Sequence, residues 1–428
     1  MSNIAKLKND ILNGVCDSSL SELYGGADSV IKMQRQRYAE ALDEFNKIYP
    51  EYTEVSVFSA PGRTEVCGNH TDHNNGKCLA AALNLDVIGV VAKCEKRLEV
   101  LSKGFKPDIL TTDDITFKKE EQNSSISLIK GICNSFLERG YNIGGFVAYT
   151  TSNVLKGSGM SSSAAFEVLV CTILNHLYND GKIDAVEVAQ ISQYAENVFF
   201  GKPCGLLDQT ASSVGGFITI DFENPKAPVI DKIDFDFEKS GYALCIVDTG
   251  GNHSDLTGEY AAIPVEMKNV ASFFGKETLR GITLKEVLQN AKALREKFGD
   301  RAVLRAIHFV NENDRVDMQS KALKENDFDA FLNTTKKSGF SSYMYLQNVY
   351  TSLNTSEQGL SLALAVSDNI LKDRGAYRVH GGGFAGTIQA FVPADMLEEY
   401  KNAIDGVFGK DACKVLNIRR HGGVLAVK

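Results

Sequence analysis

Hydrophobic positions recur along the chain with two different spacings, and together these predict a protein that mixes helices and strands. In residues 1–50 the apolar side chains return every three or four positions before Pro50, which predicts helices with charged surfaces. Residues 55–60 alternate and are rich in β-branched side chains, which predicts a strand. The mostly apolar run 79–92 predicts one or two further, buried strands.

Two helices stand out in the middle of the chain. The first covers roughly residues 162–178 and is apolar on nearly every side, so we expect it to be buried. The second begins at Asp184 with Glu187 three residues later, which resembles a capping box. It should end near Phe200, because Gly201 follows there.

The composition of the chain changes in residues 223–240, which hold two prolines among alternating polar and apolar residues. At 428 residues the chain is too long for one ordinary core. We therefore expect one domain over residues 1–225 and a second over 226–428. The second half mixes a strand over 242–248 with several helices and a glycine-rich strand near residue 380. The predicted fold class is α+β.

Charge and cysteine content narrow the class of protein further. The chain carries 46 Lys and Arg against 54 Asp and Glu, a net charge of −8, so we expect no binding to nucleic acid or to an anionic membrane. Its nine cysteines are odd in number and form no C-x-x-C pair, which argues against a disulfide framework or a zinc ribbon. No signal peptide is evident, and no apolar run approaches the roughly 18 residues of a membrane helix. These features favour a cytoplasmic protein with reduced thiols.

Three segments place small or polar residues next to regular structure. The first, Lys156-Gly-Ser-Gly-Met-Ser-Ser-Ser-Ala-Ala165, leads directly into the apolar helix. Small residues let the backbone approach an anion, and a helix N-terminus offers unpaired N–H groups with partial positive charge. The hydroxyls of residues 161–163 can bind phosphate oxygens or a magnesium ion. The segment predicts a phosphate-binding loop, and the alternative is a flexible linker that precedes a helix.

The second segment, His380-Gly-Gly-Gly-Phe-Ala-Gly386, satisfies the G-x-G-x-x-G pattern of dinucleotide-binding folds. Residues 387–392 resemble a strand, however, so the required helix after the glycines is missing. We expect a tight glycine turn between two strands, close to another backbone or a ligand. No Gly-Lys pair is followed by Ser or Thr, which excludes a Walker A loop.

The third segment, Pro61-Gly-Arg-Thr-Glu-Val-Cys-Gly-Asn-His-Thr-Asp-His-Asn-Asn-Gly76, gathers hydrogen-bonding groups of every kind. Such a set suits recognition of a polyhydroxylated ligand. Two alternatives stay open. His70 and His73 with Asp72 could ligate a metal, or the segment could be a solvated loop.

Taken in order along the chain, the three segments resemble the three motifs of the GHMP small-molecule kinases, and residues 61–76 resemble the galactokinase signature. That signature, G-R-x-N-x-I-G-E-H-x-D-Y-N, is matched at Gly62, Arg63, Gly68, His70, Asp72 and Asn74. The other two family motifs are matched at Gly157, Gly159, Ser161–Ala164, Gly381–Phe384 and Gly386. The region around Glu196 and Asp208, and residues 305–316, also resemble galactokinase stretches.

The chain departs from the signature at three positions. The family's asparagine is Glu65, its glutamate is Asn69, and its tyrosine after the aspartate is His73. An amide at position 69 can still donate to and accept from a hydroxyl, but it loses the stronger charge-assisted bond of a carboxylate. The resemblance therefore indicates the reaction and leaves the choice of sugar open.

The resemblance implies a two-domain α+β fold, with a mixed sheet in the N-terminal domain, an antiparallel sheet in the C-terminal domain and the active site between them. It implies that Asp208 is the base for the sugar's anomeric hydroxyl, and that Arg63 keeps this carboxylate ionised and stabilises the transferred phosphoryl group. The implied sugar-binding residues are Arg63, Asn69, His70, Asp72, Asp208 and Tyr260. The implied ATP-binding residues are Gly157, Ser158, Gly159, Met160, Ser161, Ser162, Ser163, Ala164, Gly382 and Gly383. The implied Mg²⁺ ligands are Ser163 and Glu196.

The activity that the resemblance implies is phosphoryl transfer from ATP to galactose, with Mg²⁺, giving galactose 1-phosphate and ADP. Three alternatives remain: a kinase for N-acetylgalactosamine or arabinose, a non-catalytic sensor of galactose and ATP, and another GHMP kinase, such as one for mevalonate or homoserine. The retained Asp208 and serine run argue against a sensor, and the segment with His70 and Asp72 argues against the last alternative. We expect only small-molecule partners, and a monomer or a weak homo-oligomer.

Overall fold

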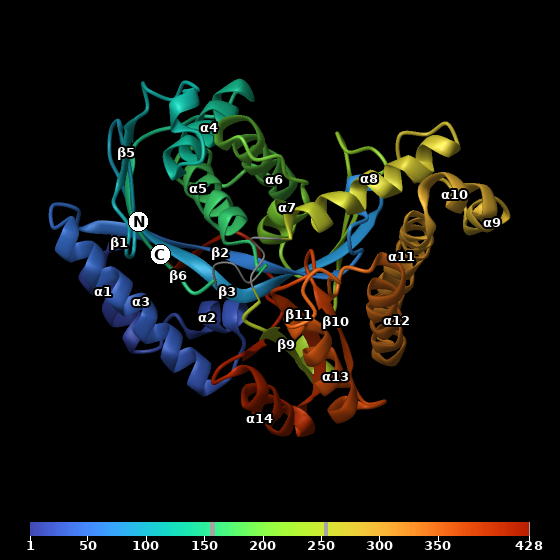
Figure 1. The fold of residues 1–428 in the computed structure, drawn as a ribbon. Helices are drawn as coiled ribbons and strands as arrows, with labels where there is room; N and C mark the ends of the chain where they lie inside the picture. Colours follow the sequence, from blue (N-terminus) through green and yellow to red (C-terminus); the bar gives the residue numbers. More distant parts are fainter. Residues whose placement is uncertain (155–158, 252–255, 428) are drawn as a thin grey trace.

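The computed structural model describes residues 1–154, 159–251 and 256–427, and within them it places two β-sheets next to each other (Figure 1). The first sheet is mixed, because β4 pairs with β6 in parallel and its other pairs are antiparallel. Its main strand order is β1-β2-β3-β6-β4-β5, with β13 added to β2 and with β7 and β8 added to β3. Its strands are β1 (Ser2–Asn3), β2 (Glu54–Cys67), β3 (Lys77–Lys93), β4 (Arg97–Ser102), β5 (Asp108–Thr111), β6 (Phe146–Ser152), β7 (Phe217–Asp221), β8 (Val229–Ile233) and β13 (Val424–Val427).

The second sheet is antiparallel throughout, in the order β10-β11-β9-β12. Its strands are β9 (Tyr242–Asp248), β10 (Ala376–His380), β11 (Thr387–Pro393) and β12 (Cys413–Leu416). The expected α+β fold, with one mixed and one antiparallel sheet, is therefore confirmed. The glycine turn expected between two strands joins β10 to β11.

Helices cover the outer faces of both sheets, in groups that follow the chain (Figure 1). One face of the first sheet packs against α1 (Ile4–Leu12), α2 (Asp17–Tyr24) and α3 (Asp28–Ile48). The opposite face packs against α4 (Ser125–Glu138), α5 (Ser162–Tyr178), α6 (Ala185–Tyr194) and α7 (Leu207–Val214). The remaining helices are α8 (Thr257–Phe273), α9 (Leu284–Gln289), α10 (Ala291–Phe298), α11 (Asp300–Lys324), α12 (Phe328–Ser341), α13 (Gly359–Leu371) and α14 (Leu397–Phe408).

Alternation along the long central strands explains how one sheet supports two layers of helices. On β2, Val57 packs with the helices of residues 4–48, whereas its neighbour Phe58 packs toward α5. Val90 and Val91 on β3 divide between the same two cores. The core on the α5 side continues into the second sheet, where it includes Leu244. The two sheets therefore share one hydrophobic core.

A buried carboxylate joins the two ends of the chain. Asp86 on β3 is fully buried and accepts hydrogen bonds from Tyr24, Arg37 and Arg419, with donor–acceptor distances of 2.5, 2.6 and 3.2 Å. Ser59 on β2 donates a further bond to it. Burial alone would raise the pKa of Asp86, but the two guanidinium charges outweigh it and hold the pKa below its usual value. The carboxylate therefore stays ionised although it is buried.

The predicted elements agree with the structure in position and differ in extent. The apolar helix has the predicted bounds, as α5. The helix expected over residues 184–200 ends as α6 at Tyr194 and continues as a π-helical turn, η3 (Ala195–Phe200). Asp184 caps α6 by accepting from two backbone N–H groups, but Glu187 bonds to Tyr141 instead of completing a capping box.

The domain boundary between residues 225 and 226 stays a prediction. The change between sheets falls between β8 and β9, and the C-terminal β13 returns to the first sheet. Among the described residues, no helix is both long enough and apolar enough to cross a membrane.

Candidate active site

Three residues from distant parts of the chain meet at the centre of the molecule. Arg63 on β2 donates from Nε to Oδ1 of Asp208, in the first turn of α7, over 2.7 Å. Ser161, just before α5, donates from its hydroxyl to Oδ2 of the same carboxylate. The structure therefore brings the predicted base, its arginine and the serine run of the predicted phosphate loop into direct contact.

The same contact organises the described part of the predicted phosphate loop. Arg63 donates to the carbonyl oxygen of Gly159 through its side chain, and to that of Met160 through its backbone N–H, over 3.1 Å for the latter. Ser161 has φ 55° and turns the chain into α5, so the N–H groups of Ser162 and Ser163 open the helix. The predicted ATP-binding residues Gly157 and Ser158 lie outside the described residues.

The environment of Asp208 favours its ionised form. Burial alone would raise the pKa of this carboxyl group, but the Arg63 charge and the hydrogen bonds from Arg63 and Ser161 outweigh it and hold the pKa below its ordinary value. The side chain nevertheless keeps 36% of its surface exposed. An ionised, accessible carboxylate beside a fixed cation is suited to accept a proton from a bound hydroxyl group.

A second group of carboxylates lies behind the start of α5. Gln209, the residue after Asp208, donates from Nε2 to Glu196 over 2.7 Å and to Glu167 over 3.1 Å. Glu167 is one helical turn after Ser163, so this link places Glu196 on the Ser163 side of α5. Burial and the Glu196 charge raise the pKa of Glu167 well above its ordinary value.

These residues fit a magnesium ion. Oε1 of Glu167 and Oε1 of Gln209 are buried and accept no hydrogen bond within the described part of the chain, so the group offers hard oxygen atoms without partners. Over the same residues, no three His, Cys, Asp or Glu side chains gather as a metal-ligand cluster. Mg²⁺ usually keeps several waters and needs few protein ligands, and its binding by Ser163 and Glu196 stays a prediction.

The predicted sugar-binding residues Asp72, His70 and Tyr260 lie near one another. Asp72 keeps a quarter of its side chain exposed, and its Oδ2 is close to Gly205, just ahead of α7. Tyr260, near the start of α8, packs its ring 5.0 Å from that of His70. Burial, followed by the negative charges of Asp72 and nearby carboxylates, raises the pKa of Tyr260 to about 12. These side chains therefore share one electrostatic environment.

Two predicted sugar ligands form hydrogen bonds within the protein itself. His70 is buried with φ 60°, and its Nε2 lies 2.8 Å from the carbonyl oxygen of Gly382. Burial lowers its pKa to about 3, so the ring is neutral and donates this bond. Asn69 is fully buried and donates hydrogen bonds to Glu65 and to the carbonyl oxygen of Gly381. Both residues join the signature to the glycine turn after β10.

The glycine turn itself lies against the signature rather than beside the described part of the phosphate loop. A Cβ on Gly382 would overlap the ring of Tyr260, and one on Gly383 would overlap the backbone of Asn348. The turn comes near the loop at His380, which would lie 3.7 Å from a Cβ on Gly159. The ATP-binding roles assigned to Gly382 and Gly383 stay predictions.

Several residues of the site were not predicted. Gln209 follows Asp208 directly, and Glu167 is a lone charge in an apolar helix, so the neighbouring sequence could have indicated both residues. Nothing in the neighbouring sequence indicates Arg378 or Asn348, because they contact the signature only in the folded chain.

Comparisons with known proteins show which families the chain is similar to. Residues 127–216 match the GHMP kinases N terminal domain, and residues 43–93 match the galactokinase galactose-binding signature. Galactokinase of Clostridium tetani is 29% identical over 378 residues, which cover 87% of this chain and 92% of that protein. Galactokinase of Actinobacillus pleuropneumoniae is 28% identical over 362 residues, or 82% and 89% of the two chains. The chain is similar to galactokinases and to the GHMP kinases over most of its length.

Two solved structures, of a galactokinase and of a mevalonate kinase, share the fold of this chain. The crystal structure of Lactococcus lactis galactokinase complexed with galactose superposes with a TM-score of 0.75 at 22% identity, covering 91% of this chain and all of that one. Mevalonate kinase of Methanococcus jannaschii gives a TM-score of 0.61 at 14% identity, over 85% and 98% of the two chains. The match to the GHMP kinases N terminal domain implies the use of ATP.

Proposed function

We propose that this kinase transfers the γ-phosphoryl group of ATP to the anomeric hydroxyl of galactose, giving galactose 1-phosphate and ADP. The observation that carries the proposal is the junction of Arg63, Asp208 and Ser161. It joins a carboxylate that can accept a hydroxyl proton to the start of a helix that can hold phosphates. The match to the galactose-binding signature supports galactose as the acceptor.

Positioning and charge stabilisation are the main requirements of phosphoryl transfer. In the proposed reaction Asp208 accepts the proton of the sugar hydroxyl, and the sugar oxygen forms a bond to the γ-phosphorus. The bond between that phosphorus and the β–γ bridging oxygen breaks, and ADP leaves with the electron pair. Arg63 keeps Asp208 ionised and stabilises negative charge on the phosphoryl group.

The start of α5 would hold the phosphates of ATP through the backbone and hydroxyl groups of residues 159–164. Ser163 and Glu196 would hold Mg²⁺, with Glu167 and Gln209 behind them. A bound magnesium ion neutralises charge on the β- and γ-phosphates. On the sugar side, Arg63, Asp72 and Tyr260 present polar atoms to the acceptor.

A coupled assay of ADP release tests the proposal directly. ADP should appear only when galactose, ATP and Mg²⁺ are all present, and omission of any one should abolish it. Binding of ATP and galactose without turnover would instead support a sensor. The expected monomer or weak homo-oligomer and the cytoplasmic location stay predictions.

A second candidate is the same reaction on a related sugar. Position 69 favours this candidate, because the family signature has a glutamate there and this chain has Asn69. The amide of Asn69 is buried and hydrogen-bonded within the protein. N-Acetylgalactosamine and arabinose in the same assay separate the two candidates, because the preferred substrate has the highest kcat/KM.

A further inference from the structure

An exchange of charge distinguishes this chain from the galactokinase signature. The signature has an amide where this chain has Glu65 and a carboxylate where it has Asn69. In the structure these two side chains are in contact, because Nδ2 of Asn69 donates to Oε1 of Glu65 over 2.9 Å. The exchange therefore keeps an amide–carboxylate pair and moves its negative charge from the loop onto β2.

Asn69 has no hydrogen-bonding capacity left for a ligand. Its second N–H donates to the carbonyl oxygen of Gly381 over 2.7 Å. Its Oδ1 accepts from Nδ2 of Asn348 over 2.7 Å and from the hydroxyl of Ser342 over 3.4 Å. A side-chain amide has two donors and two acceptor positions, so all four are used. The fully buried Asn69 holds the site together and does not face a sugar.

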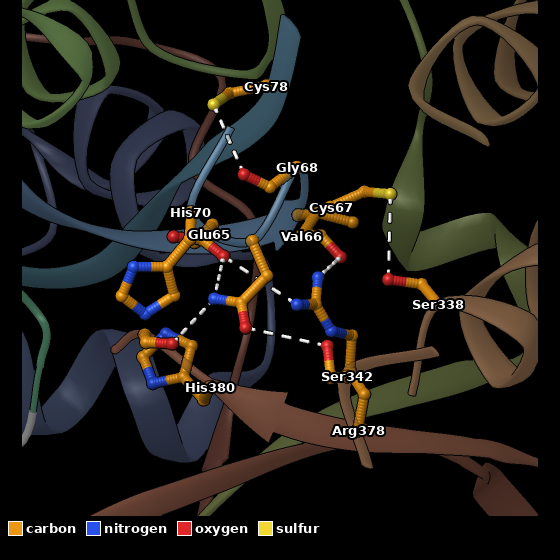
Figure 2. Close-up of polar contacts among 12 residues, drawn as sticks. Glu65, Val66, Cys67, Gly68, His70, Cys78, Ser338, Ser342, Arg378 and His380 are labelled. Atoms are coloured by element: carbon orange, nitrogen blue, oxygen red, sulfur yellow. Dashed lines mark hydrogen bonds and ion pairs between the residues drawn. The ribbon is translucent and has the colours of Figure 1, made fainter. Parts of the chain in front are cut away.

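The carboxylate of Glu65 can still accept hydrogen bonds. Among the described residues only Asn69 donates a hydrogen bond to its carboxylate, and Nη2 of the fully buried Arg378 lies 3.6 Å from Oε1 as an ion-pair partner. Figure 2 shows Arg378 extending from β10 toward Glu65 and the carbonyl oxygen of Val66. The Glu65 side chain keeps 14% of its surface exposed. Oε2 is therefore open to accept from a bound molecule.

The position of Glu65 on β2 directs this carboxylate into the site. Arg63 and Glu65 are two residues apart in a regularly paired part of the strand, so their side chains leave the same face. Arg63 contacts Asp208 on that face. The charge of Glu65 acts on Tyr260, as do the charges of Asp72 and Asp208. Glu65 thus belongs to the same group of side chains as the proposed base.

We propose that Glu65 is a specificity-determining residue of this kinase, whose carboxylate accepts a hydrogen bond from a hydroxyl group of the bound sugar. Asn69 and Arg378 are positioning residues that fix the carboxylate. The inference rests on the proposed function, because it concerns the acceptor of the same reaction. A hydrogen bond to an ionised carboxylate is about twice as strong as a neutral one, so this contact should contribute strongly to the choice of sugar.

The surroundings of Glu65 should make the affinity for the sugar depend on pH. Burial raises the pKa of Glu65 to about 7, against the opposing effect of Arg378. A hydroxyl that donates to the carboxylate favours its charged form, so sugar affinity should rise as the pH increases from about 6 to about 8. The charged and titratable groups that face Glu65 are Arg63 on β2, Asp72 in the signature loop, Cys78 on β3, Tyr260 on α8 and Arg378 on β10.

The decisive experiment compares the full-length protein with its Glu65→Gln variant on galactose and the set of monodeoxygalactoses. Gln keeps the shape of the side chain and removes its charge. The KM for galactose should rise about 10- to 100-fold, as expected for loss of a charged hydrogen bond, while the KM for ATP stays unchanged. One deoxygalactose should be a much poorer substrate than galactose for the parent protein and nearly equal to galactose for the variant. The rise of sugar affinity with pH should also disappear.

If Glu65 only stabilised the fold through its ion pair with Arg378, the deoxygalactose experiment would give a different result. The parent and Glu65→Gln would then show the same loss with every deoxygalactose, and this outcome overturns the inference. Glu65→Asp provides a second variant if Glu65→Gln does not fold, because it keeps the charge beside Arg378 and retracts the carboxylate. It should also raise the KM for galactose, and an unchanged KM contradicts the inference. Glu325→Gln, at the exposed C-cap of α11, is the matched control and should have the same kinetics as the parent.

Failure of the inference and failure of the proposed function are distinguishable. If the parent protein releases no ADP with any sugar, the proposed function is wrong. If the parent phosphorylates galactose and the deoxygalactose profile does not depend on Glu65, only the inference is wrong.

Discussion

At the scale of single residues, the site depends on charges that are buried and paired. Without Arg63 the pKa of Asp208 would be higher, because burial raises this pKa and Arg63 lowers it. Arg63 also binds the carbonyl oxygen of Gly159, so one side chain sets both the ionisation of the proposed base and the position of the phosphate loop. Replacements at this junction should therefore affect chemistry more than binding.

The Asp208→Asn variant tests the base. It should reduce kcat by about 1,000-fold, because the amide cannot accept the proton of the sugar hydroxyl. Isothermal titration should still detect galactose binding, since the amide oxygen can accept from Arg63. Asp231→Asn, at an exposed ion pair with Lys324, should leave the rate unchanged. A rate for Asp208→Asn within a few-fold of the parent would show that another group takes the proton.

The same residues show what sequence could and could not predict. The serine run before an apolar helix is a local pattern, and the family resemblance joined Arg63 to Asp208. The full set of hydrogen bonds of Asn69 was not predictable, because one of its two acceptors and both of its donors come from residues 342–381 through the folded chain. The sequence located the exchange with Glu65, but only the structure shows which of the two side chains remains free.

At the scale of elements, the phosphate loop is packed directly against β2. A Cβ on Gly62 would lie 2.8 Å from the carbonyl oxygen of Met160, closer than the backbone allows. The helix α5 and the strand that carries Arg63 therefore meet without a side chain between them. This close approach fixes the start of α5 relative to the proposed base.

The Gly62→Ala variant should reduce kcat/KM for ATP by about 100-fold, because a displaced loop misaligns the phosphates. Steady-state kinetics at saturating galactose measure the effect. Gly406→Ala in α14 is the matched control, since a Cβ there meets no atom within 4 Å and alanine favours a helix. Equal kinetics for Gly62→Ala and the control would contradict the proposed packing role.

A second contact between elements holds the signature segment, residues 61–76, against α11 and α12. Glu312 on α11 is fully buried and accepts from the backbone N–H of Gly68 over 3.2 Å, from Arg315 over 2.6 Å and from Ser338 on α12. Burial would raise the pKa of Glu312, but the cations around it hold the pKa well below the ordinary value of 4.5. One carboxylate thus joins two helices to the loop that follows β2.

The Glu312→Gln variant should lower the free energy of unfolding at neutral pH by about 3 kcal/mol, because it leaves the buried Arg315 without its charge partner. Since the folded pKa is depressed, the contribution of the carboxylate is complete above pH 4.5 and is lost as the pH falls below it. Urea titrations at several pH values should therefore show the difference from the parent shrinking toward acid. A difference that does not change with pH would point to lost packing instead.

At the scale of the whole molecule, the two sheets behave as one unit. Gln389 on β11 donates to the carbonyl oxygens of Glu65 and Val66 on β2, and Arg378 donates to that of Val66. The core that surrounds α5 continues into the second sheet. The site is built from both sheets, so its geometry depends on this connection.

We therefore expect one cooperative unfolding transition. The chain has no Trp and 15 Tyr, so near-UV circular dichroism reports tyrosine packing and far-UV circular dichroism reports backbone structure. The two curves should coincide in urea, and galactose at 100 times its Kd should add about 2.7 kcal/mol to the stability. Two separated transitions would show that the sheets unfold independently.

The buried Asp86 has a consequence for how the protein folds. Its carboxylate is balanced by Arg37 in α3 and by Arg419, which lie far apart in the sequence. A chain in which the segment around Arg419 is not yet in place would hold a buried anion with only one of its two guanidinium partners. The packing of α3 against β3 must therefore form together with the return of the segment around Arg419, as one cooperative step of folding.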